Sequence, residues 1–131
     1  MSSPALTPAL TVGKRLVELC NAGQFYQAVT ELYGPSIVSV EATAEPGQSP
    51  EVQGLPEVLK KMQWWTDNHE VHGSTTTGPF PHLGDRFAVI FEFDVTPKFG
   101  PMNGKRFTMQ EVGVYTLKDS KIVREEFFYS M

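Results

Sequence analysis

In the stretch Arg86-Phe87-Ala88-Val89-Ile90-Phe91-Glu92-Phe93-Asp94-Val95-Thr96, large apolar residues alternate with polar or smaller ones. This period of two predicts a β-strand. One face would carry Phe87, Val89, Phe91, Phe93 and Val95. An aromatic face of this size has to be covered by other secondary structure, so we expect helices to pack on it.

Outward from this strand, further β-prone segments at 69–80, 105–118 and 121–129 are bounded by Gly, Pro or Asn-Gly signals. We therefore expect a run of long antiparallel strands in the second half of the chain.

The first half has a helical pattern. Thr11 is placed to cap a first helix that Gly23 ends, and a second apolar stripe runs from Phe25 to Tyr33, where Gly34-Pro35 cannot continue a helix. A short strand is expected at 37–40, a mobile loop without core residues at 42–54, and a third helix from about Leu55-Pro56.

Helices that precede a meander of strands indicate an α+β fold, with three N-terminal helices on one face of a curved, mainly antiparallel sheet. We expect a flexible tail at 1–10 and one domain at 11–131.

Composition and charge argue against several classes of function. The chain has 131 residues and a net charge of −4, which disfavours a nucleic-acid groove or an anionic membrane surface. Cys20 is the only cysteine, so neither a disulfide framework nor a thiolate metal cluster is expected. The first eight residues lack the basic residues and the apolar region of a secretory leader, and no stretch approaches the ~20 apolar residues that span a bilayer, so we expect a cytoplasmic protein.

The last two strands carry the most unusual chemistry. A type I turn with a bulge at Lys118-Asp119-Ser120-Lys121 would pair Tyr115 with Val123, Gly113 with Glu125 and Glu111 with Phe127. Two carboxyl groups would then lie on one largely apolar face, with Glu125 in space left free by Gly113. That face would hold Met109, Glu111, Gly113, Tyr115, Leu117, Val123, Glu125, Phe127 and Tyr129.

Three segments resemble the SnoaL-like branch of the NTF2-like superfamily. They are Gly13-Lys14-Arg15-Leu16-Val17-Glu18-Leu19-Cys20-Asn21-Ala22-Gly23, Glu31-Leu32-Tyr33-Gly34-Pro35-Ser36-Ile37-Val38-Ser39-Val40-Glu41 and Lys121-Ile122-Val123-Arg124-Glu125-Glu126-Phe127-Phe128-Tyr129. The resemblance implies a cone in which a bent sheet and helices enclose an apolar cavity. It also implies a homodimer joined through the outer sheet face, where Ala88, Ile90, Val112, Val114 and Phe128 would form an apolar stripe. The same cone serves isomerases, cyclases, dehydratases and binding modules, so the resemblance does not select a reaction.

Ketosteroid isomerases of that superfamily use a carboxylate base with a tyrosine and a protonated aspartic acid. The corresponding positions here are Val40, Leu16 and a place near Gly113, all of them apolar or empty. That constellation is therefore not expected, although Glu41 or Glu111 lies close enough in sequence to supply a carboxylate.

Glu111 and Glu125 are the main catalytic candidates. Two carboxyl groups in an apolar cavity cannot both ionise cheaply, so one pKa should rise. A carboxyl group with a raised pKa beside an ionised one is the usual basis for separate acid and base roles. The alternative is that both side chains lie on the convex face and pair with Arg106 or Arg124.

Tyr115, Tyr129 or His69 would stabilise an oxyanion, while Tyr26 and Tyr33 offer further hydroxyl groups or plain core. His69 and His72 lie three apart in a strand and lack the i, i+4 spacing of a helical zinc motif, so a metal site is not expected. We also expect no cofactor. Trp64 would flank the cavity mouth or pack under the 42–54 loop, and Trp65 would be core. The expected substrate-binding residues are Tyr129, Phe91, Phe93, Trp64, Tyr33 and Met109.

Two functions remain. One is a cofactor-free isomerase, cyclase or lyase acting on a small, mostly apolar organic molecule. The other is a non-catalytic ligand-binding or dimerisation module. The enzyme requires an open pocket of at least ~300 Å³ that one glutamate reaches.

Overall fold

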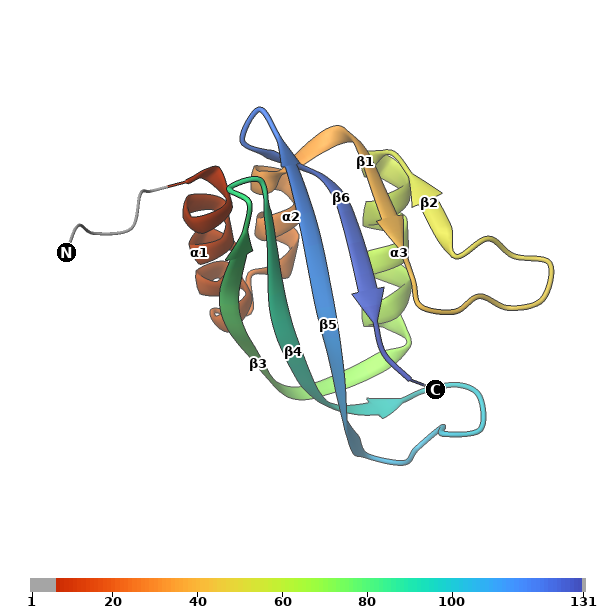
Figure 1. The fold of residues 1–131 in the computed structure, drawn as a ribbon. Coiled ribbons are helices and arrows are strands. Elements are labelled where there is room, and N and C mark those ends of the chain that lie inside the picture. Colours follow the sequence, from red (N-terminus) through yellow and green to blue (C-terminus); the bar gives the residue numbers. More distant parts are fainter. Residues whose placement is uncertain (1–6, 131) are drawn as a thin grey trace.

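The computed structural model describes residues 7–130, which form three helices and one six-stranded mixed sheet. The sheet order is β2-β1-β6-β5-β4-β3, and only the pair β1 and β6 is parallel (Figure 1). The elements in chain order are α1 (Pro8–Asn21), α2 (Phe25–Leu32), β1 (Tyr33–Val40), β2 (Glu51–Gln53), α3 (Leu55–Asp67), β3 (His69–His82), β4 (Arg86–Pro97), β5 (Phe107–Lys118) and β6 (Lys121–Phe128).

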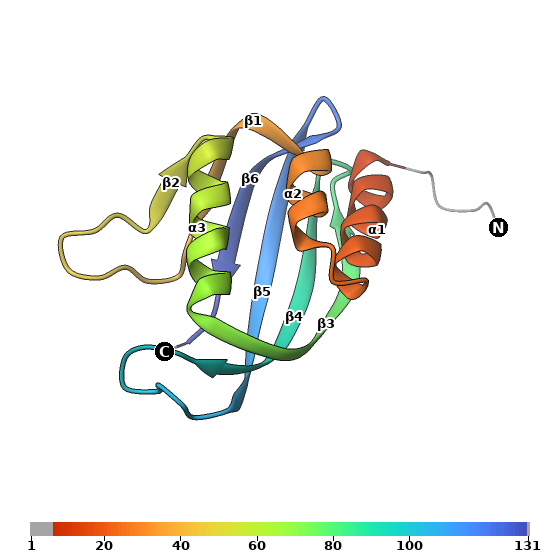
Figure 2. The same ribbon diagram turned by 180° about the vertical axis from the view of Figure 1, so that it is seen from behind.

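All three helices lie on the same side of the sheet, whose long strands curve around them (Figure 2). The predicted aromatic face of β4 is buried beneath this helical layer, with Phe87 and Val89 almost fully enclosed. Burial of apolar area at this interface is the main stabilising contribution to the fold. The α+β architecture predicted from the alternating strand is thus confirmed.

The helices are not all N-terminal, because α3 follows β1 and β2. The 42–54 segment was predicted to be loop throughout, yet its end forms β2, which pairs with β1 through Val38, Ser39 and Val40. Tyr33 was predicted at the end of the second helix but is the first residue of β1. The helix ends at Leu32, one residue earlier than predicted, so Tyr33, which precedes the Gly34-Pro35 pair, already belongs to the strand.

The first helix also starts earlier than predicted. Thr7 rather than Thr11 caps it, accepting a hydrogen bond from the backbone N–H of Leu10 at 3.2 Å. Pro8 fills the first turn, where its missing N–H costs nothing. Residues 8–10 of the predicted tail are therefore helical, and residues 1–6 lie outside the described part of the chain.

The final hairpin has a different register from the predicted one. Asp119 and Ser120 both have positive φ, as in a type I′ turn. An irregularity between Thr116 and Leu117 then aligns Tyr115 with Glu125. The predicted pairs were wrong by two residues, a shift that leaves Glu125 on the predicted face. Ile122 takes the core position that we expected for Val123.

Gly13 sets how closely α1 approaches β3. A Cβ atom there would lie 2.6 Å from Cβ of Pro79 and 3.2 Å from the Phe87 ring. Alanine favours helix by about 1 kcal/mol, but overpacking against a rigid proline costs about 1–3 kcal/mol. We expect Gly13→Ala to lower the thermal midpoint by roughly 5 °C.

Calorimetry of Gly13→Ala beside Gly73→Ala provides the check, because nothing lies within 4 Å of a Cβ built at Gly73. An unchanged midpoint for Gly13→Ala would contradict the close approach of α1.

Candidate functional site

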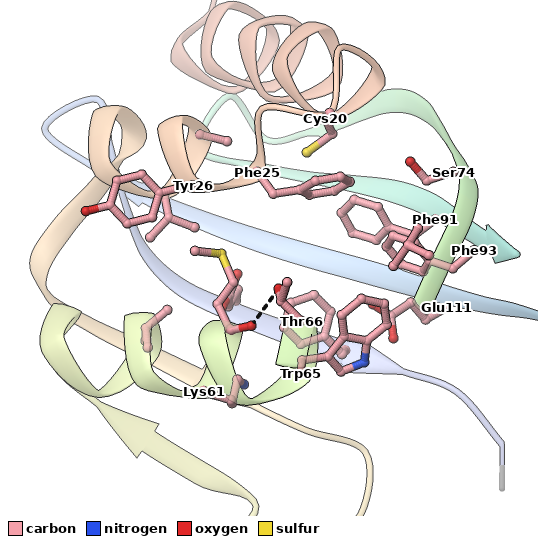
Figure 3. Close-up of a pocket in the computed structure, with 18 of the residues that line it drawn as sticks. Cys20, Phe25, Tyr26, Lys61, Trp65, Thr66, Ser74, Phe91, Phe93 and Glu111 are labelled. Carbon is pink, nitrogen blue, oxygen red and sulfur yellow. Dashed lines mark hydrogen bonds between the residues drawn. The ribbon is translucent and has the colours of Figure 1, made fainter. Parts of the chain in front are cut away.

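A cavity of about 620 Å³ lies between the helical layer and the sheet. Figure 3 shows Lys61 and Trp65 on α3 at one side of this cavity, with Phe25 and Tyr26 of α2 at another. The apolar lining includes Leu16, Cys20, Phe25, Ala28, Val29, Val58, Met62, Trp65, Phe91, Phe93 and Phe127. Ionisable side chains from both layers complete it, namely Tyr26, Tyr33, Glu41, Lys61, His72, Glu111 and Glu125.

Five of the predicted site residues line this cavity. They are the two carboxylic acids and three aromatic side chains, Glu111, Glu125, Tyr33, Phe91 and Phe93. The other five, which do not line it, are His69, Tyr115, Tyr129, Trp64 and Met109.

His69 is held away from the cavity by the end of α3. Its Nδ1 lies 2.8 Å from the carbonyl oxygen of Trp65, and its ring stacks on that indole with centroids 4.3 Å apart. His72 lines the cavity instead, with Nε2 2.7 Å from Oγ1 of Thr96. A bulge in β3 between Val71 and Gly73 changes which side chains face inward, which strict alternation could not anticipate.

Trp65 packs against the core, as predicted, and also lines the cavity. Trp64 does not line the cavity, so the prediction that it flanks the mouth is wrong; it is 52% exposed and packs edge-on against Phe99. The apolar stripe of α3 therefore faces the cavity, and Trp64 lies off that stripe.

Tyr115 is core, stacked on Phe87 with ring centroids 5.0 Å apart. Space above Gly113 is filled by this tyrosine and Phe91, since a Cβ there would lie 2.9 Å from Cε2 of Tyr115 and 3.0 Å from Cε2 of Phe91. The prediction that Glu125 fills this space was wrong, because Glu125 pairs with Tyr115 rather than Gly113.

Glu125 lies on the cavity wall with 3% of its surface exposed. The parallel register of β1 and β6 sets Ser39 beside it, and the serine hydroxyl donates to Oε1 at 2.7 Å. The Tyr33 hydroxyl donates to Oε2. Burial raises the pKa of Glu125, and these two hydrogen bonds oppose the rise.

Lys61 and Glu41 extend this network. Lys61 was missed as a site residue in the sequence, whereas Glu41 was named there only as an alternative source of a carboxylate. The Lys61 ammonium donates to Oγ of Ser39 at 2.6 Å and forms an ion pair with Glu41 at 2.7 Å. The Tyr129 hydroxyl donates to the other oxygen of Glu41 at 2.9 Å. A signal was present, because Lys61 lies three residues after Val58 and four before Trp65, on the apolar stripe of α3.

Glu111 faces the cavity from β5, and the pKa of its carboxyl group is raised from 4.5 to about 7. Burial is the largest cause, and the charges of Glu41 and Glu125 add to it, while Lys61 acts in the opposite direction. At neutral pH this carboxyl group can both accept and release a proton.

The alternative placement of the two acids on the convex face is wrong. The arginines proposed as partners bind other carboxylates. Arg106 binds Asp94 through two hydrogen bonds of 2.9 and 2.8 Å, and Arg124 lies 3.3 Å from Glu126.

The raised pKa of Glu111 links stability to pH. An unfolded Glu111 ionises near pH 4.5, whereas the folded one holds its proton until about pH 7. The folded state therefore loses stability as the pH rises through this window, by roughly 3 kcal/mol once both states are ionised.

Denaturant unfolding of the wild type and Glu111→Gln between about pH 4.5 and pH 8 should show the wild type losing stability relative to the variant. Parallel curves would mean that the folded carboxyl group ionises as easily as the unfolded one.

Within residues 7–130, no group of three or more His, Cys, Asp or Glu residues is arranged to hold a metal ion. Among the same residues, no helix is long and apolar enough to cross a membrane. Cys20 lines the cavity, and burial raises the pKa of its thiol to about 12, so the nucleophilic thiolate is disfavoured.

The SnoaL-like domain family model matches residues 8–129, almost the whole described chain. This chain belongs to the SnoaL-like family. A solved structure from Mesorhizobium loti, described as a candidate SnoaL-like polyketide cyclase, is 41% identical, with a TM-score of 0.83 over 91% of this chain and 97% of that one.

More distant structures share the fold alone. An NTF2-like protein from Burkholderia thailandensis is 16% identical, with a TM-score of 0.76 over 96% of this chain and 92% of that one. A candidate isomerase from Bacillus subtilis is 13% identical, with a TM-score of 0.71 over 94% of this chain and 86% of that one. No curated protein matches the chain. The predicted resemblance to the SnoaL-like family is thus confirmed.

Proposed function

We propose that this SnoaL-like protein is a cofactor-free enzyme that moves a proton on a small, mostly apolar organic molecule, in a reaction of the isomerase, cyclase or lyase type. Glu111 is the acid and base. The observation that carries the proposal is the location of this carboxyl group, which lies on the wall of a large apolar cavity with a pKa of about 7. General acid–base catalysis is most efficient when the pKa lies near the working pH.

The size and lining of the cavity support this assignment. Its volume of about 620 Å³ is twice the ~300 Å³ at the lower end of ligand pockets. Apolar and aromatic side chains dominate the walls, so binding would come from apolar burial, and a few polar groups would orient the ligand. The M. loti relative is described as a candidate polyketide cyclase, which is consistent with chemistry on a carbonyl compound.

Exchange of deuterium into a model ketone tests this function directly. We expect the protein to accelerate exchange of the acidic C–H protons of 2-tetralone in D₂O, followed by NMR. The rate should rise as Glu111 ionises near pH 7. Exchange no faster than in buffer, at saturating protein and with bound ketone, would contradict the proposal.

A non-catalytic binding module is the second candidate. It is favoured by the positions of His69, Tyr115 and Tyr129, because none of these predicted oxyanion donors lines the cavity. Such a module would bind 2-tetralone without accelerating exchange.

The homodimer also belongs to this proposal. Along β4 the residues of the predicted outer stripe alternate with Phe87 and Val89, which are buried under the helices, and Phe128 within the stripe is 55% exposed. An exposed apolar stripe of this kind suits a two-fold contact between copies. Sedimentation equilibrium should give twice the chain mass, and Phe128→Glu should shift it to the monomer. The cytoplasmic location remains a prediction from the sequence.

A further inference from the structure

Proton removal beside a carbonyl group needs a donor for the oxygen that becomes negative. Within the described residues that line the cavity, Lys61 is the only lysine or arginine. Its side chain is 25% exposed, so its charge is only partly screened by water.

The position of Lys61 is fixed by two contacts. Ser39 and Glu41 lie 2.6 and 2.7 Å from Nζ, on the β1 side of the helix. An ammonium group has three N–H donors, and these contacts engage two of them. Nζ also lies 5.4 Å from the centre of the Phe127 ring, another part of the cavity wall. One N–H donor is therefore left for a ligand.

Charge restricts what can bind beside this donor. Three carboxylic acids, Glu41, Glu111 and Glu125, line the same cavity. Lys61 already neutralises Glu41, so no cation is left to pair with a carboxylate or phosphate group of a ligand. A neutral ligand avoids this repulsion.

We propose that Lys61 is a catalytic residue that donates its remaining N–H to the carbonyl oxygen of a neutral ketone or ester with an acidic C–H bond beside the carbonyl group. This inference rests on the proposed function of Glu111. It goes further in naming the substrate class and the oxyanion donor.

The step balances without an added reagent. The C–H bond breaks, and its proton goes to the Glu111 carboxylate. The electron pair of that bond forms a C=C bond, and the π pair of the carbonyl group moves onto oxygen, which accepts the hydrogen bond from Lys61. Return of the proton from Glu111 to another carbon completes an isomerisation. Alternatively, the enolate carbon attacks a second carbonyl carbon of the same molecule. A C–C bond forms, the π pair of that carbonyl group moves onto its oxygen, and Glu111 returns its proton to this alkoxide, which completes a cyclisation.

A phenol tests the donor separately from the base, because phenolate resembles enolate. The probe is 2-naphthol, whose ionisation is followed by absorbance, and it is bound to Glu111→Gln so that the base is absent. We expect the apparent pKa of bound 2-naphthol to be about one unit or more below its value in buffer. An equal or higher pKa would overturn the role of Lys61.

The companion variants are Glu111→Gln/Lys61→Met and Glu111→Gln/Lys60→Met. Lys60 is a matched control because its side chain is 75% exposed and pairs with Glu57 outside the cavity. We expect the shift to disappear with Lys61→Met and to remain with Lys60→Met. A shift that survives Lys61→Met would overturn the inference. If Lys61→Met prevents folding, the titration of 2-naphthol bound to Glu111→Gln still tests the inference, because an equal or higher pKa there contradicts the role of Lys61.

Binding of 2-methoxynaphthalene, measured by calorimetry, separates the two proposals. This ether fills the cavity but cannot ionise. If it binds while 2-naphthol shows no shift, only the role of Lys61 fails. If neither probe binds, the proposed function fails together with the inference.

Discussion

Glu111→Gln should reduce the protein-catalysed exchange of 2-tetralone protons by at least about 100-fold, the usual contribution of a positioned acid or base. Glutamine keeps the shape of the side chain but cannot accept the proton. Glu111 has the pKa that suits this role, and Glu125 is already engaged by Ser39 and Tyr33. The rate constant at saturating ketone is the quantity to compare.

The matched control is Glu92→Gln. Glu92 lies on β4, the neighbouring strand, where it does not line the main cavity and accepts a hydrogen bond from Gln110. It should retain full exchange activity. Equal activity of Glu111→Gln and the wild type would remove Glu111 from the mechanism, whatever happens at Glu92.

The largest effect on stability is expected at Glu125. Replacement by alanine leaves the hydroxyl groups of Tyr33 and Ser39 without their acceptor and opens a void in the core. Unsatisfied buried groups cost about 1–3 kcal/mol each. We expect Glu125→Ala to lower the free energy of unfolding by about 3 kcal/mol, which corresponds to a thermal midpoint roughly 10 °C lower.

Comparison with Glu125→Gln separates the contribution of the negative charge from that of the side-chain volume. It preserves the volume and an acceptor oxygen, and it removes a carboxyl group whose pKa is raised by burial. Its unfolding free energy should stay within about 1 kcal/mol of the wild type, because lost hydrogen bonding and relieved desolvation offset each other. A loss as large as that of alanine would show that the negative charge itself is structural.

Local patterns predicted the fold well wherever the residues of a segment settle its structure among themselves. The alternation in β4 gave its buried face, and the glycine and proline signals delimited the long strands. The prediction failed at β2, where three residues with no core pattern become a strand only because the edge of β1 is available. Pairing with a distant edge leaves no local signal.

In the candidate site, too, local patterns predicted some features, whereas contacts between distant segments decided the others. Glu111 and Glu125 could be singled out because side-chain parity along a strand survives a register shift of two residues. Lys61, Glu41 and Ser39 could not be grouped, since Lys61 comes from α3 and the other two from the end of β1, about 20 residues earlier in the sequence. Contacts with the end of α3 likewise hold the predicted His69 away from the cavity, and His72, beside the bulge in β3, lines it instead.

The α+β class and the orientation of two acids toward an apolar interior could be predicted from the residues alone, because strand and helix periodicities are local properties. The family followed from the resemblance of three segments. Which groups meet those acids depends on the folded arrangement. Packing α3 over β1 and β6 brings Lys61 to Ser39 and Glu41, and burial there sets the proton affinities on which the proposed chemistry depends. Desolvation and charge coupling act through space, so they arise only once distant segments have come together.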